Sequence, residues 1–97
     1  MKKFSISECE ILLKSIVAIT NEEDAKKFLE DVCTIKELQD MTQRITVAKL
    51  LSERKSYQEI SKETGASAAT ISRVSRCLNY GDGGYETILT AIGEKKV

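Results

Sequence analysis

The sequence contains no histidine, no proline and no tryptophan among its 97 residues. Histidine is the commonest general base and a frequent metal ligand, so its absence argues against enzymatic chemistry and against a metal site. Three cysteines are present, Cys9, Cys33 and Cys77, but they form no C-x-x-C pair that could hold zinc or carry redox chemistry. We expect three buried, reduced thiols in a protein that is not an enzyme and has no cofactor.

Long apolar runs are also absent. No stretch approaches the roughly 20 apolar residues of a membrane span. The basic start, Met1 to Lys3, is followed by polar and acidic residues rather than by the apolar region of a secretory signal. Hydrophobic residues make up 41% and charged residues 31%, which is the balance of a globular domain. We therefore expect one domain over residues 1–97, with no membrane attachment and a cytoplasmic location.

The net charge is zero, with 15 basic and 15 acidic residues, but the charges are unevenly placed. Acidic residues lead in the first half, as in Glu22 to Asp24. Between Arg54 and Arg76 the basic residues outnumber the acidic ones, which are only Glu59 and Glu63. This distribution predicts a local basic surface in the second half, of the kind that a nucleic acid could use.

The periodicity of the apolar residues predicts an all-α protein of about six helices, because no run shows the sustained alternation of a strand. The first expected helix covers about 7–20, and a second starts at Asn21. A third begins at the run 34–37 and ends near 52–55. The remaining helices are expected at about 56–64 and 68–78, with a short final one around 85–92.

The first helix has one apolar stripe, and the second has an apolar face that we expect to be buried. A chain of this length cannot easily bury both faces alone, so we expect a dimer. The stripe contains Ile11, Leu12, Ser15, Ile16 and Ile19, and the face contains Ala25, Phe28, Leu29 and Val32.

Helix ends are marked by capping residues. Asn21 is a good N-cap before an acidic first turn. The runs Thr34 to Glu37 and Ser56 to Glu59 have the capping-box pattern, in which a hydroxyl and a carboxylate satisfy the first amide groups reciprocally. Gly65 follows the second of these helices and predicts its end, because glycine readily adopts a positive φ.

The segment from about residue 56 to 78 has the features of a helix-turn-helix. Ser61 is small, Gly65 lies at the turn, and Ile60, Ile71 and Val74 are placed to anchor the two helices to a core. The second helix then turns a different set of residues outward: Ala68, Ala69, Ser72, Arg73 and Arg76. Small residues permit a close approach to base edges, and arginine can bind guanine or phosphate. The alternative is an ordinary helical corner whose polar residues are merely solvated.

Several runs resemble one family. Tyr57 to Ile60 (YQEI), Thr64 to Val74 (TGASAATISRV) and Arg76 to Gly81 (RCLNYG), with Gly84-Tyr85, look like the Trp-repressor-related YerC/YecD family, a branch of the tryptophan repressor superfamily. Asp31 to Leu38 and Gln43-Arg44 are similar too, so the resemblance covers about residues 8 to 90. It implies an all-helical, intertwined homodimer that regulates transcription, as a repressor, from an approximately palindromic operator in double-stranded DNA.

The resemblance also implies which residues form the sites. The helix from Ser67 to Leu78 would enter the major groove. The implied DNA-binding residues are Lys62, Ser67, Ala68, Ala69, Thr70, Ser72, Arg73 and Arg76. The implied effector pocket contains Arg44, Arg73, Val74 and Cys77, although for Arg44 an ion pair with an acidic residue of a neighbouring helix is the alternative.

Tryptophan is an unexpected effector, because a branched Val74 and Cys77 stand where the tryptophan repressor has Gly and Ser. The identity of any small-molecule effector stays open. A second function is also open, in which the helical corner is a protein-interaction module without a specific DNA target.

Overall fold

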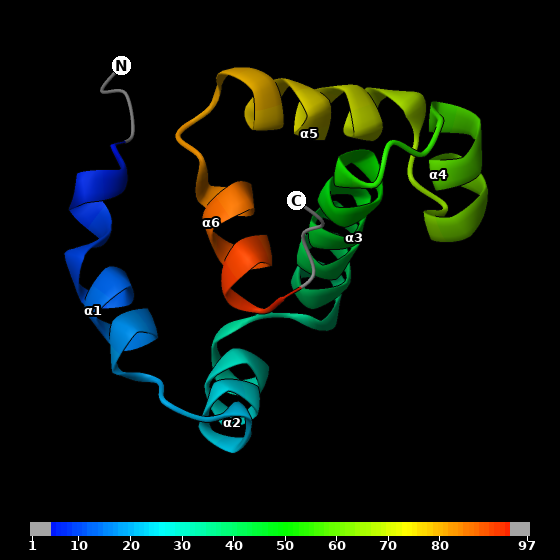
Figure 1. The fold of residues 1–97 in the computed structure, drawn as a ribbon. Coiled ribbons are helices and arrows are strands. Elements are labelled where there is room, and N and C mark those ends of the chain that lie inside the picture. The colour runs from blue at the N-terminus through cyan, green and yellow to red at the C-terminus, as the bar shows by residue number, and fades with distance from the viewer. Residues whose placement is uncertain (1–4, 94–97) are drawn as a thin grey trace, which may run out of the picture. The chain divides into compact units, whose positions relative to one another are not determined.

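A computed structural model describes residues 5–93 of the chain. They form a short 3-10 helix, η1 (Ile6–Cys9), and six α-helices: α1 (Glu10–Ala18), α2 (Glu22–Val32), α3 (Ile35–Ser52), α4 (Tyr57–Thr64), α5 (Ala68–Tyr80) and α6 (Gly84–Ala91) (Figure 1). No strand occurs in this range, so the all-α prediction is confirmed. None of these helices is both long and apolar enough to cross a lipid bilayer.

The chain divides into two compact units, one within Met1–Ile35 and one within Lys36–Val97. In the first unit, the single helix expected over 7–20 is a turn of 3-10 helix followed by α1, which ends at Ala18. The predicted N-cap of α2 is confirmed, because the Asn21 side-chain oxygen accepts a hydrogen bond of 2.8 Å from the Asp24 amide.

The first unit buries none of the residues of its three helices. The single chain therefore does not bury the apolar faces of α1 and α2, which were expected to need a second copy of the chain. Ile11 is 83% exposed, Ile16 53% and Val32 55%. Amphipathic helices bury their apolar faces only against other elements, and two such short helices offer each other too little surface.

The expectation of buried thiols is also wrong. All three cysteines are free, as expected of reduced thiols, but Cys9 and Cys33 are half-buried and Cys77 is exposed. Cysteine packs as a small hydrophobic residue wherever a core is available. Cys9 and Cys33 belong to the first unit, whose helices bury no residue. Cys77 lies on the solvent-exposed side of α5.

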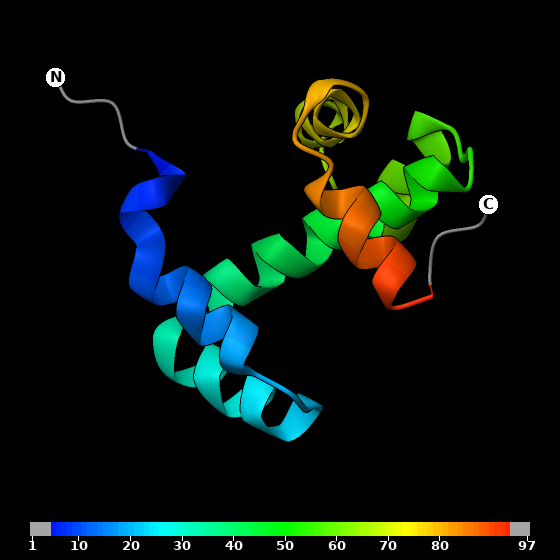
Figure 2. The same cartoon turned by 60° about the vertical axis from the view of Figure 1, so that its left-hand side comes forward.

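The second unit contains the buried core. α4 and α6 lie beside α3 in both views, and α5 extends past the end of α3 (Figures 1 and 2). The residues that these helices and the connecting turn bury together are Val47, Ala48, Leu50, Ile60, Ala66, Ile71, Val74 and Leu89. Leu51, Leu78 and Tyr85 pack around this cluster. The core thus joins four helices, and both helices of the predicted helix-turn-helix are fixed to it.

The predicted ends of α4 and α5 are confirmed. Ser56 and Glu59 form a complete capping box, with hydrogen bonds of 3.1 Å and 3.0 Å. Gly65 ends α4 with a φ of 74°, in the left-handed region. Ser67 caps α5, which continues to Tyr80, two residues beyond the predicted end at Leu78.

Replacing Gly65 by alanine should destabilise the protein by about 1 kcal/mol, because a Cβ is strained at positive φ. A Cβ at this position would meet no atom within 4 Å, so backbone conformation alone sets the effect. The matched control is Gly84→Ala, since Gly84 has equal space and no positive φ. Thermal denaturation should show a lower Tm for Gly65→Ala only, and equal Tm values for the two variants would contradict this account of the turn.

Candidate nucleic-acid interface

The turn between α4 and α5 is held by side-chain hydrogen bonds to its backbone. The Thr64 hydroxyl donates to the Ile60 carbonyl at 2.7 Å and accepts from the Ala66 amide at 3.1 Å. The Ser61 hydroxyl donates to the Ala66 carbonyl at 3.0 Å. Both polar backbone groups of the buried Ala66 are therefore satisfied, which matters because an unpaired buried amide costs free energy comparable to a lost hydrogen bond.

A further hydrogen bond joins the turn to α3. The Gln43 side-chain nitrogen donates to the Thr64 carbonyl at 3.1 Å. This carbonyl belongs to the last residue of α4 and has no partner within that helix. Gln43 therefore fixes the end of α4 against α3, independently of the apolar core.

The predicted anchoring residues lie where the sequence placed them. Ile60 and Ile71 are fully buried and Val74 is 2% exposed. They come from both helices of the motif and pack against Val47 and Ala48 of α3. Since residues three and four apart share a face of a helix, this packing leaves the opposite face of α5 to solvent.

That opposite face contains five predicted DNA-binding residues, all of which are exposed: Ala68, Ala69, Ser72, Arg73 and Arg76. Lys62, on α4, is exposed as well. The face combines short side chains at the start of α5 with guanidinium groups further along it. It presents no acidic side chain on α5, whose only charged residues are Arg73 and Arg76.

Ser67 and Thr70 have a structural role in the same region. The Ser67 hydroxyl oxygen accepts from the Thr70 amide at 3.1 Å and lies 3.1 Å from the Thr70 hydroxyl. Both hydroxyl groups thus take part in capping α5. Thr70 is half-buried, while Ser67 is exposed.

Beside this face is a pocket of about 370 Å³ between α3, α5 and α6. It is lined by Arg44, Thr70, Arg73, Val74, Cys77 and Tyr85. The structure therefore brings together the four residues proposed from the sequence for an effector pocket. Val74 forms the buried part of the wall, whereas Arg44, Arg73 and Cys77 are exposed.

The two arginines of the pocket have no acidic partner in the described part of the chain. No carboxylate of residues 5–93 lies within ion-pair distance of Arg44 or Arg73. The alternative expectation for Arg44, an ion pair with a neighbouring helix, is therefore not met in the single chain. Burial raises the pKa of the Tyr85 phenol, as does Cys77, while Arg44 and Arg73 act in the opposite direction.

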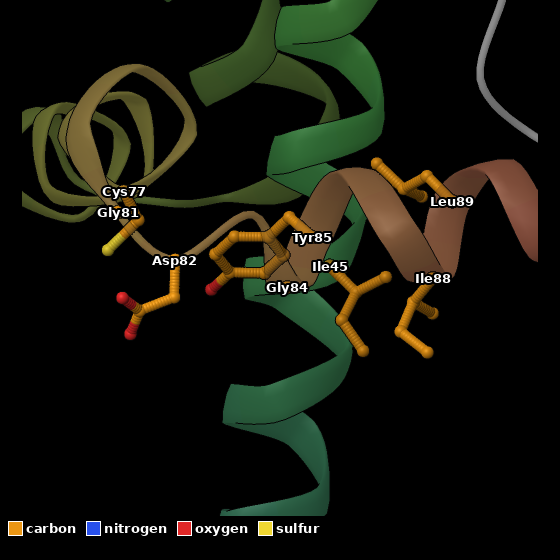
Figure 3. A pocket seen from close by; sticks show the side chains of 8 residues that line it. All are labelled: Ile45, Cys77, Gly81, Asp82, Gly84, Tyr85, Ile88 and Leu89. Atoms are coloured by element: carbon orange, nitrogen blue, oxygen red, sulfur yellow. The ribbon is translucent and has the colours of Figure 1, made fainter.

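A second hollow, of about 520 Å³, shares Cys77 and Tyr85 with this pocket and is mostly apolar. Figure 3 shows the ring of Tyr85 beside Ile45 of α3, with Ile88 and Leu89 further along α6. Ile45 is 42% exposed and Ile88 53%. Among the described residues, Asp82 is the only charged one in its lining.

The described geometry defines a helix-turn-helix held on a helical core. Residues 7–92 match the family model described as Trp repressor protein, so the chain belongs to the Trp repressor family and is placed among helix-turn-helix regulators. Among curated proteins, the chain is similar to the uncharacterized protein YerC of Bacillus subtilis (strain 168), with 47% identity over 87 residues, which are 90% of this chain and 84% of YerC.

Two solved structures are similar over nearly the whole chain. A TrpR-like protein from Eubacterium eligens ATCC 27750 has a TM-score of 0.86 and 43% identity, and the match covers 94% of each chain. A protein from Staphylococcus aureus, described provisionally as a Trp repressor, has a TM-score of 0.87 and 34% identity, covering 98% of this chain and 100% of that one. Both likenesses support the predicted fold class.

Sequence reasoning missed three contributions to the region. Gln43 and Thr64 hold the turn, and Tyr85 completes the wall of the pocket. A threonine directly before a helix-ending glycine is a signal for Thr64, because threonine hydroxyls bond to nearby backbone groups. Tyr85 and Gln43 act across long sequence separations, for which a single sequence has no local signal.

Replacing Thr64 by valine should lower the free energy of unfolding by about 1–3 kcal/mol, because it leaves the buried Ala66 amide without its acceptor. The matched control is Thr42→Val. The Thr42 hydroxyl also bonds to a carbonyl four residues earlier, at 2.8 Å, but supports no buried amide. Urea denaturation should separate the two variants, and an equal small loss in both would show that the Ala66 bond is dispensable.

Proposed function

We propose that the chain is a sequence-specific, DNA-binding transcriptional repressor that acts as a homodimer through α4 and α5. The observation that carries this proposal is the exposed, acid-free face of α5, anchored to the core by Ile71 and Val74 in a member of the Trp repressor family. The proposal implies that the protein acts in the cytoplasm and that the whole chain forms a single DNA-binding domain.

In the proposed complex, α5 enters the major groove with its first turn toward the bases. The methyl groups of Ala68 and Ala69 are short enough to allow close approach and can contact thymine methyl groups. Ser72, one turn further along, can hydrogen-bond to a base edge. Lys62 and Arg76 contact backbone phosphates, which supplies affinity without sequence preference. Ser67 and Thr70 lie at the edge of the proposed contact with DNA, and their hydroxyl groups are hydrogen-bonded to each other at the start of α5.

The proposed homodimer covers apolar surface that the single chain leaves exposed. Ile11 and Val17 of α1 are 83% and 82% exposed, and in the second unit Ile88 and Ile92 are 53% and 60% exposed. Exposed apolar surface on this scale is typical of protein interaction sites. Two recognition helices related by a two-fold axis then require an approximately palindromic operator, with half-sites about one helical turn apart.

The pocket lined by Arg44, Arg73, Val74 and Cys77 is the proposed effector site. Tryptophan is a poor candidate, because the branched Val74 occupies wall space that a glycine would leave open to an indole ring. The second candidate function is a protein-interaction module without a DNA target, which is favoured by the same exposed apolar residues that support the dimer.

Replacing Ser72 or Arg76 by alanine should affect DNA binding in different ways. A preferred site is first selected from a library of DNA fragments. Ser72→Ala should weaken binding to this site by roughly 1–3 kcal/mol and relax one base position. Arg76→Ala should weaken binding to all sequences and reduce the slope of log affinity against log salt by about one. Fluorescence anisotropy over a salt series measures both effects.

The control for these variants is Lys26→Ala, which removes one exposed cation from α2. It should change neither the preferred site nor the salt slope. If no fragment is enriched, or if both α5 variants bind all DNA like the parent chain, α5 does not read DNA. The interaction module would then be the better account.

Replacing Ile11 by glutamate should dissociate the dimer. Ile11 is 83% exposed in the single chain, so a charge there does not disturb packing within one copy but disfavours burial between two. Sedimentation at micromolar concentration should give two chains for the parent and one for Ile11→Glu. Thr20→Glu adds the same charge just after α1 and should remain dimeric. A folded monomeric parent would contradict the proposal.

A further inference from the structure

The loop between α3 and α4 contains a strained residue. Arg54 has a φ of 63°, and among the residues that the structure describes it is the only one other than glycine with a positive φ. A residue that has a Cβ is strained in this left-handed region. Gly65, after α4, has a similar φ of 74° without this strain. Glycine at position 54 would therefore stabilise the chain, yet the sequence has arginine there.

The backbone around Arg54 is fixed by hydrogen bonds. The Arg54 amide donates to the Leu51 carbonyl at 3.0 Å, and the Lys55 amide donates to the Leu50 carbonyl at 3.1 Å. These two bonds form the Schellman motif, which ends a helix with a left-handed residue. The capping box of α4 follows directly. Arg54 and Lys55 thus stand on a backbone whose conformation is set before any partner binds, which lowers the entropy cost of a contact.

Arg54 and Lys55 are exposed cations without a counter-charge in the chain. No cation between residues 54 and 76 has an ion pair within residues 5–93. The Glu59 carboxylate, four residues after Lys55, accepts a hydrogen bond from the Ser56 amide instead. In contrast, lysines of α1, α2 and α3 pair with acidic residues one turn away. The side chains of Arg54 and Lys55 are therefore available to an anion outside the chain.

We propose that Arg54 and Lys55 bind the phosphate backbone of DNA beside the groove that α5 enters, and that the strain at Arg54 is tolerated for this contact. The inference rests on the proposed function. The first helix of a helix-turn-helix crosses the DNA backbone, and the loop leads directly into that helix, α4 (Figure 1). The eight residues of α4 are about 12 Å long. Lys55 before its start and Lys62 near its end can therefore contact different phosphates, which are about 3.4 Å apart along one strand.

This contact adds positive charge that α5 by itself does not supply. The only charged residues of α5 are Arg73 and Arg76. The formal net charge of the chain is zero, so attraction to DNA depends on local cations rather than on the overall field. The planar guanidinium of Arg54 can bind a phosphate through two parallel hydrogen bonds. Phosphate contacts fix the orientation of a protein on the duplex, so this loop would help to direct α5 into the groove.

The first experiment compares Arg54→Gly with Arg54→Ala. Both variants remove the charge, but only glycine removes the strain at positive φ. Thermal denaturation should give a Tm a few degrees higher for Arg54→Gly than for the parent and for Arg54→Ala. Equal Tm values for the two variants would overturn the strain at Arg54.

The second experiment measures DNA binding by fluorescence anisotropy over a salt series, on the selected site and on a random duplex. Arg54→Gly, Arg54→Ala and Lys55→Gln should each weaken binding to both duplexes and lower the salt slope by about one for each chain that contacts DNA. The loss at 0.1 M salt should be about eightfold per chain relative to 1 M salt, because a slope smaller by about 0.9 gives that factor. Arg54→Lys, which keeps the charge but not the planar fork, should keep the slope.

The control is Lys26→Gln, which makes a matching change of net charge on α2 and should bind both duplexes like the parent. If the Arg54 and Lys55 variants bind like the parent while Arg76→Ala shows its expected loss, the second contact is overturned and the proposed function stands. If the parent binds neither duplex, the proposed function and this contact fail together. Because Arg54→Gly is expected to be more stable than the parent, a loss of DNA binding in this variant cannot come from misfolding.

Discussion

The turn between α4 and α5, with the buried Ala66 at its centre, is the constraint on which the rest of the second unit depends. Gly65 reverses the chain at positive φ, and the next residue, Ala66, is buried with both its polar backbone groups bonded to side chains. This arrangement fixes how α5 leaves α4. The direction of α5 in turn decides which of its faces meets the core and which meets solvent, and therefore where Arg73 and Arg76 point.

Much of this unit could be predicted from the sequence, because its determinants are local. Ser56 with Glu59, Gly65 and Ser67 each specify a helix end within three or four residues. The spacing of Ile60, Ile71 and Val74 then gave the buried face correctly. The pocket residues Arg44 and Val74 lie on different helices, and only the family resemblance brought them together before the structure did.

The apolar faces of α1 and α2 could be predicted as patterns, and within one copy of the chain they are exposed. A periodic stripe such as Ile11 and Ile16 indicates that a helix face favours burial, but it does not say which surface covers it. Within one copy of the chain the first unit has no such surface, and the second unit leaves Ile45 and Ile88 exposed. The expectation that Cys9 and Cys33 are buried failed for the same reason, because the first unit of a single chain has no surface that buries them.

The separation of the two faces of α5 has an evolutionary consequence. Ala68, Ala69 and Ser72 are exposed and outside the core cluster, so exchanging them for other residues changes stability by only about 0.5 kcal/mol in either direction. Ile71 and Val74, interleaved with them in sequence, carry the packing. A duplicated copy of this chain could therefore acquire new contacts through a few substitutions on one helix, while its core and its turn remained as they are.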